Sequence, residues 1–215
     1  MTSRAALDAL RPEWDALWSS VPDSPRSSTA PGSLPTTRGA LSAAIGSHMA
    51  RNIRQQWHRA ERLGRVAVRH EQSNTLESTL DALFRLHAKR WNAKGSPGVL
   101  ADPQIRDFHC HAAEGLLCAG LFRLHSLWIG AEVAAVYYGF HTSSRDYFYI
   151  GGFDPSFSSI GAGSLTIAAA IDRAIAERSL AFDFLGGREP YNYEWGAVDR
   201  ARVTRHLQRR EPEQV

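Results

Sequence analysis

The sequence predicts an α/β domain in which helices flank a mixed, mostly antiparallel β-sheet. Between residue 41 and Gly120, three segments repeat their apolar residues with the period of a helix. After Gly120 the period changes to two, which is typical of β-strands. Helical periodicity then returns at residues 162–178, and a short apolar strand follows at residues 181–185. With a last strand near the C-terminus, the expected order is helices, an antiparallel meander, a helix and two strands.

The elements before Gly120 are expected in the following order. A helix covers residues 41–63, and the strand RVAVRHE follows it at residues 65–71. Thr75 can begin the next helix, and Asp102 caps a third at residues 103–118, with a proline in its first position. The second helix has a core side made of seven residues: Leu76, Leu80, Leu83, Phe84, Leu86, His87 and Trp91.

The strands after Gly120 are expected to form an antiparallel meander. Three alternating segments are separated by the turn sequences IGAE and TSSRD. A last strand is expected around residues 202–207, after the aromatic stretch FDFLGGREPYNYEWG.

The chain is expected to divide into three parts. Residues 1–20 contain a short amphipathic helix, and residues 21–40, rich in proline, serine and threonine, have the composition of a flexible linker. Residues 41–215 form the domain with the sheet.

Composition limits the class of protein. With 215 residues, of which 43% are hydrophobic, the chain can bury a full core. A net charge of +3 permits an anionic ligand such as a phosphate-bearing cofactor, but it does not argue for nucleic acid. No apolar run reaches the ~18 residues of a membrane span, and the first residues lack a signal-peptide core. We therefore expect a cytoplasmic protein.

The two cysteines are Cys110 and Cys118, eight residues apart on one expected helix. We expect them to be buried as small hydrophobic residues rather than joined in a disulfide, as suits a reducing compartment.

A candidate cofactor site lies where the strand DYFYIGGF leads through a loop into a helix that begins at residues 161–164. Free backbone N–H groups at a helix start can hold phosphate oxygens. A Gly151-Gly152 bulge would also leave backbone groups that an amide-bearing pantetheine arm could pair with. The spacing SxxGAG matches neither a dinucleotide fingerprint nor a Walker loop, and plain turn chemistry also explains such glycines. The candidate residues are Ile150, Gly151, Gly152, Gly161, Ala162, Gly163 and Ser164.

From about residue 50 to residue 196 the chain resembles the GNAT-related acyltransferase domain of CelD/BcsL-type proteins of polysaccharide biosynthesis, and it is distantly similar to Fem-type aminoacyl transferases. Four segments carry the resemblance: LFRLHAKRW (83–91), GSPGVLADPQIRDFH (95–109), YFYIGGFDPSFSSIGAGSLTIAAAI (147–171) and FDFLGGREPYNYEWGA (182–197). The resemblance implies a GNAT fold, acetyl-CoA or another acyl-CoA bound at splayed strands and the following helix, and a sugar hydroxyl or amine of an envelope precursor as acceptor.

The chain departs from this family in two ways. Gly186, Arg188, Asn192 and Glu194 stand where the family motif FDFLRGDEPYKYRWG has an arginine, an acid, a lysine and a basic residue, so a cation is lost. The family also has a larger N-terminal half, of which residues 1–20 resemble a remnant. Exposed apolar faces left by the missing half lead us to expect a homodimer.

Acyl transfer from a thioester requires a base for the acceptor, donors for the oxyanion and an acid for the thiolate. The candidate bases are Glu189, which precedes a proline and should lie in a loop, and Asp183. Asp183 could instead pair with a buried arginine such as Arg90. Tyr191 and Tyr193 are candidate proton donors, although tyrosines at this spacing often only pack. No HExxH, CxxC or GxSxG motif is present, so neither a metal nor a serine hydrolase site is expected.

Three functions remain open. The first is an acyl-CoA-dependent N- or O-acyltransferase. The second is a shortened, non-catalytic binding module, which the altered motif favours. The third is a Fem-like transferase that uses aminoacyl-tRNA, favoured by a stripe of arginines: Arg51, Arg54, Arg59, Arg62 and Arg65.

Overall fold

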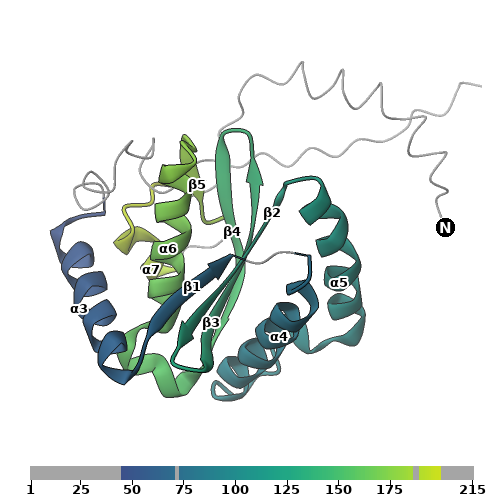
Figure 1. The fold of residues 1–215 in the computed structure, drawn as a ribbon, viewed down its shortest axis with the longest axis horizontal. Helices are drawn as coiled ribbons and strands as arrows, with labels where there is room; N and C mark the ends of the chain where they lie inside the picture. The colour runs from purple at the N-terminus through teal and green to yellow at the C-terminus, as the bar shows by residue number, and fades with distance from the viewer. Residues whose placement is uncertain (1–44, 71–72, 186–188, 200–215) are drawn as a thin grey trace, which may run out of the picture. The chain divides into compact units, whose positions relative to one another are not determined.

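The computed structural model describes residues 45–70, 73–185 and 189–199, all of which belong to a compact unit that spans residues 28–199. The expected N-terminal helix and linker and the expected strand at residues 202–207 lie outside the described residues. Figure 1 shows the helices on both sides of one twisted sheet.

The described elements agree in order with the expected ones. The helices are α3 (Ser47–Leu63), α4 (Leu76–Asn92), α5 (Pro103–Cys118), α6 (Ala162–Ala176) and α7 (Pro190–Glu194), with two 3₁₀ helices, η1 (Val99–Ala101) and η2 (Pro155–Ile160). The strands are β1 (Val66–His70), β2 (Phe122–Ile129), β3 (Glu132–Thr142), β4 (Arg145–Phe153) and β5 (Ala181–Asp183). Helix α3 begins later than residue 41, and α7 was expected as part of a loop.

The sheet has the order β1-β2-β3-β4-β5. The first three pairs of neighbours are antiparallel, and β5 runs parallel to β4, which confirms the mixed, mostly antiparallel sheet. The pairing of β4 with β5 ends at Tyr147 and Asp183, whereas β4 itself continues to Phe153. The last part of β4 therefore has no described strand on its β5 side.

Each face of the sheet is covered by its own helices. Helices α4 and α5 pack on one face, where Leu124, Val136 and Tyr138 point, and α3 and α6 cover the other face (Figure 1). Adjacent residues of β3, such as Tyr137 and Tyr138, point to opposite faces because side chains alternate along a strand. Among the helices of the described part, none has the length and apolarity of a membrane span.

Local sequence signals place α4 and α5 well. The Asp102 side chain accepts a hydrogen bond from the Gln104 amide at 2.8 Å, as expected for the cap of α5. The core side of α4 is buried as predicted from Leu76 to His87, and Trp91 is half-buried.

The expected burial of the cysteines is wrong. Cys110 and Cys118 are both free thiols, but both are exposed. Helix α5 turns His109 and Ala113, one helical turn apart, towards the core. Cys110 is the neighbour of His109 in sequence, so it points about 100° away from this buried face.

The expected position of the β-bulge is also wrong. Gly151 and Gly152 remain paired with β3, and the register shifts between Tyr138 and Gly139, which leaves Tyr149 as the extra residue of β4. A Cβ at Gly139 would lie 2.1 Å from the carbonyl oxygen of Tyr147. The bulge therefore depends on Gly139 of β3, not on Gly151 and Gly152.

Candidate functional site

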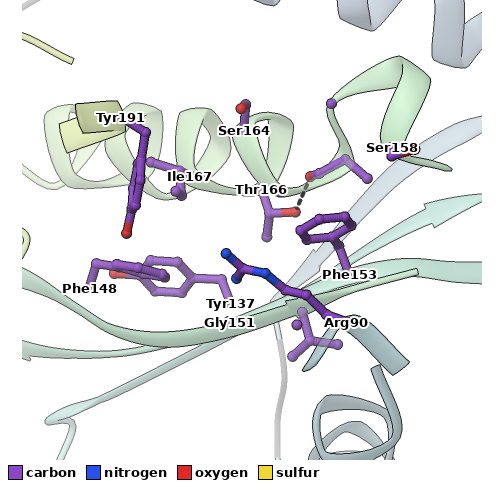
Figure 2. A pocket seen from close by; sticks show the side chains of 15 residues that line it. Arg90, Tyr137, Phe148, Gly151, Phe153, Ser158, Ser164, Thr166, Ile167 and Tyr191 are labelled. Atoms are coloured by element: carbon purple, nitrogen blue, oxygen red, sulfur yellow. Dashed lines mark hydrogen bonds between the residues drawn. The ribbon is translucent and has the colours of Figure 1, made fainter. Parts of the chain in front are cut away.

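A cavity of about 290 Å³ lies between α6 and the end of the sheet formed by β3 and β4 (Figure 2). Its lining is Arg90, Val136, Tyr137, Phe148, Gly151, Gly152, Phe153, Ser158, Gly161, Ala162, Gly163, Ser164, Thr166, Ile167 and Tyr191. These residues come from six elements, α4, β3, β4, η2, α6 and α7, so only the folded chain brings them together.

The cavity unites most of the residues predicted to bind a cofactor. Six of the seven line it: Gly151, Gly152, Gly161, Ala162, Gly163 and Ser164. Ile150 does not, because it packs with the core of α4 and α5 on the opposite face of the sheet. Of the four catalytic candidates, Tyr191 lines the cavity, whereas Asp183, Glu189 and Tyr193 are not among its lining residues.

The start of α6 leaves backbone amides without a side-chain cap. Gly161, the residue before the helix, adopts the left-handed conformation (φ 65°, ψ 42°), and no side chain caps the helix. The first amide that bonds back to Gly161 is that of Leu165, at 3.0 Å. The amides of residues 162–164 precede it, and the positive end of the helix dipole favours a negative charge beside them.

Two of the glycines are required, one by its backbone conformation and one by packing. Gly161 is required mainly by its left-handed backbone, because a Cβ there would meet only the flexible end of the Gln56 side chain of α3, at 2.4 Å. A Cβ at Gly152 would lie 2.7 Å from the amide nitrogen of His87, so Gly152 lets α4 approach β4 closely. These glycines therefore shape the site through chain geometry, whereas Gly163 has only the Phe153 ring near its Cβ position, at 3.3 Å.

The loop before α6 is anchored to α4. The Asp154 carboxylate accepts a hydrogen bond from the Ser156 amide at 3.0 Å and forms an ion pair with Lys89 at 2.7 Å. The hydrogen bond from Lys89 and those from Ser156 lower the pKa of Asp154, against the opposing effect of burial. This contact fixes the loop that leads into the first turn of α6.

Tyr191 enters the cavity from the short helix α7. Pro190 opens this helix after Glu189, whose backbone is extended and whose side chain is exposed, as expected for a residue before proline. Burial raises the pKa of the Tyr191 hydroxyl, the charge of Glu189 raises it further, and the charge of Arg90 opposes them. Tyr191 therefore holds its proton at neutral pH and can act as a donor.

Asp183 ends β5 in a buried position, with 1% of its surface exposed. Its carboxylate accepts a hydrogen bond from the Leu185 amide at 2.7 Å, and Leu185 has a positive φ of 63°. This bond holds the turn that leaves the sheet. The Phe182 and Phe184 rings pack against each other, 5.3 Å between centroids, in the core under α6.

Among the described residues, Arg90 does not form the expected ion pair with Asp183. Its guanidinium instead lies over the Phe153 ring, 5.1 Å from the centroid, within the cavity (Figure 2). A signal was present in the sequence, because Arg90 follows the buried residues Leu86 and His87 by one helical turn. A charged residue on the apolar face of a helix indicates a special role.

No group of three or more histidine, cysteine, aspartate or glutamate side chains in the described ranges could hold a metal ion.

This combination of a helix start, an open strand and a shared cavity is typical of an acyltransferase fold. Residues 47–193 match the family model described as "Acetyltransferase (GNAT) domain". The chain therefore belongs to the GNAT acetyltransferase domain family.

Solved structures share the fold at low sequence identity. FemX superposes with a TM-score of 0.60 at 10% identity, over 80% of this chain and 58% of FemX. A conserved protein of unknown function from Bacteroides thetaiotaomicron VPI-5482 has a TM-score of 0.58 at 13% identity, over 88% of this chain and 63% of its own. The C-terminal domain (DUF2156) of a putative lysylphosphatidylglycerol synthetase from Agrobacterium fabrum has a TM-score of 0.53 at 9% identity, over 82% of this chain and 58% of its own. The chain thus spans less than two thirds of each of these structures. No curated protein sequence matches it significantly.

Proposed function

We propose that this GNAT domain binds acetyl-CoA or another acyl-CoA and transfers the acyl group to an amine or a sugar hydroxyl of a polysaccharide or envelope precursor, as in CelD/BcsL-type proteins. One observation carries the proposal. Ala162, Gly163 and Ser164, which begin α6, line the same cavity as Tyr191. A diphosphate and a reacting thioester could thus occupy its two ends.

The backbone supplies the contacts for the donor. The amides of residues 162–164 would hold the diphosphate at the start of α6. The pantetheine arm carries amides that can pair with the part of β4 beyond Tyr147, where the pairing with β5 has ended. These contacts orient the thioester and exclude water from it.

The side chains then move two protons. In the proposed reaction the acceptor nitrogen or oxygen forms a bond to the acyl carbon, and the bond from that carbon to sulfur breaks. Glu189, exposed beside α7, or Asp183 takes the acceptor proton through water, and Tyr191 donates a proton to the departing thiolate. Tyr191 has the better support because it lines the cavity. Tyr193 is a weaker candidate, since its hydroxyl donates to Asp199 at 2.8 Å.

Binding of CoA tests the proposal directly. Mass spectrometry of the purified native protein should detect co-purified CoA or an acyl-CoA, and calorimetry should show saturable binding of acetyl-CoA. Absence of heat at high acetyl-CoA concentration would leave a non-catalytic binding module as the better interpretation.

An aminoacyl-tRNA-dependent transferase is the second candidate. The likeness of the fold to FemX and the exposed arginines of α3 favour it. Binding of bulk tRNA that weakens steeply with salt, together with no binding of acetyl-CoA, would support this function over the first.

A further inference from the structure

Arg90 is the one charged side chain among the described residues that line the cavity. It comes from α4, on the opposite side of β4 from α6, and reaches into the space beneath α6. Figure 2 shows its guanidinium between Tyr191 and Phe153, below Thr166 and Ile167. The remainder of the lining is apolar or uncharged.

Within the described residues, Arg90 contacts the Phe153 ring but has no carboxylate partner. The Nε atom of Arg90 is buried and has no hydrogen-bond partner, and no carboxylate there forms an ion pair with the guanidinium. Another largely buried arginine of this chain does have carboxylate partners. Arg123, with 11% of its side chain exposed, forms ion pairs with both Asp146 and Glu177. A cation in a largely apolar cavity is costly unless an anion joins it.

We propose that Arg90 binds a carboxylate of the ligand that fills this cavity. The identity of the ligand rests on the proposed function. The planar guanidinium can donate two parallel hydrogen bonds to a carboxylate. The carboxylate belongs either to the acyl group of the donor, as in a dicarboxylic acyl-CoA, or to the acceptor.

The position of Arg90 favours a carboxylate over the donor diphosphate. The backbone amides at the start of α6 already provide a place for the diphosphate. Figure 2 shows the guanidinium between Phe153 and Tyr191, the candidate proton donor, and both Arg90 and Tyr191 line the cavity. A group bound by Arg90 would therefore sit near the reacting end of the ligand.

Calorimetry with four probes tests this proposal: CoA, acetyl-CoA, succinyl-CoA and free succinate. The variant is Arg90→Gln, and the matched control is Arg85→Gln, an exposed arginine on the same helix. We expect Arg90→Gln to weaken binding of the carboxylate probe about 10- to 100-fold, as the loss of charge-assisted hydrogen bonds does. Binding of CoA and acetyl-CoA should stay within about threefold of wild type, and Arg85→Gln should change nothing. Thermal unfolding confirms that each variant folds, and Arg90→Lys, which keeps the charge without the fork, should bind with intermediate affinity.

The four probes distinguish a carboxylate on the acyl group from a carboxylate on the acceptor. Wild-type preference for succinyl-CoA over acetyl-CoA, lost in Arg90→Gln, assigns the carboxylate to the acyl group. Equal binding of the two thioesters, with succinate binding that requires Arg90, assigns it to the acceptor. If Arg90→Gln weakens the binding of CoA, acetyl-CoA and succinyl-CoA equally, Arg90 contacts phosphate and the proposal is overturned. The proposal is also overturned if Arg90→Gln changes the binding of none of the four probes. Succinate binding that depends on Arg90 without any binding of CoA would refute the proposed function and leave the carboxylate site standing.

Discussion

The hydroxyl of Tyr137 donates a hydrogen bond to the carbonyl oxygen of Tyr147, 3.0 Å away. Tyr147 is the last residue of β4 that pairs with β5, so this bond holds β4 where its neighbour ends. Gly139 makes the contact possible, because a Cβ there would lie 2.4 Å from the Tyr137 hydroxyl. The tyrosine ring also lines the cavity, and the bond thus links the bulge to the candidate site.

We expect Tyr137→Phe to lower the free energy of unfolding by about 1–3 kcal/mol, because it removes a buried donor and leaves the Tyr147 carbonyl without that partner. Urea unfolding measures the change. The matched control is Tyr149→Phe, on the bulge of β4 with 46% of its surface exposed, which should change stability by less than about 0.5 kcal/mol. Equal losses in the two variants would refute this role of the Tyr137 hydroxyl.

Two glycines of the cavity should respond differently to alanine. Gly152→Ala places a methyl group 2.7 Å from the α4 backbone, which cannot move aside easily, and should cost about 1–3 kcal/mol. Gly163→Ala adds a methyl group in the first turn of α6, where alanine favours the helix, and stability should stay within about 1 kcal/mol of wild type.

The affinity of Gly163→Ala for acetyl-CoA is a second property to measure, besides its stability. Gly163→Ala should weaken this binding, because the new methyl group lies in the cavity beside the amides that we propose hold the diphosphate. Thermal unfolding and calorimetry on the same samples separate the two effects. Unchanged affinity in Gly163→Ala would argue against a donor at this helix start.

Tyr191→Phe should slow release of CoA from acetyl-CoA by about 10²–10⁴-fold in a thiol assay with an active acceptor, as loss of a general acid does. Affinity for acetyl-CoA should change little, since the ring remains in the cavity. The control is Tyr193→Phe, on the same helix but outside the cavity lining. If both variants keep full activity, the proton reaches the thiolate by another route.

Sequence patterns predicted those elements that depend on neighbouring residues. The cap at Asp102 and the apolar stripe of α4 are local signals, and both define their helices correctly. The bulge was misplaced because its cause is a contact between strands: Gly139 of β3 meets the backbone of β4 at Tyr147. Periodicity within one strand contains no information about such a contact.

The candidate site was predicted only in part, because some of its residues follow a local pattern and others meet through contacts between distant segments. The glycines near α6 stand in a local strand-loop-helix pattern, so most of them were found. Tyr137 and Arg90 join the cavity through long-range packing across the sheet. The helical spacing of Arg90 from Leu86 and His87 marks it as unusual, but it does not indicate which cavity the side chain enters. The exposed cysteines follow the same rule, because the rotation of α5 is set by what packs on His109 and Ala113.

The pH dependence of stability should reflect His87, of which only 2% is exposed. Burial, followed by the charge of Arg90, lowers the pKa of His87 from 6.5 to about 4. The unfolded chain binds a proton at this residue near pH 6.5, and the folded chain does so only near pH 4. Between these values the unfolded state holds more protons, so stability falls as the pH falls.

We expect His87→Leu, which cannot take up this proton, to reduce the loss of stability between pH 6.5 and pH 4 by up to about 3 kcal/mol relative to wild type. Urea unfolding at several pH values across this window gives the two slopes. The control is His111→Leu, which removes an exposed histidine of α5 instead of a buried one. Parallel curves for wild type and His87→Leu would show that His87 accepts a proton equally well in the folded and unfolded chains.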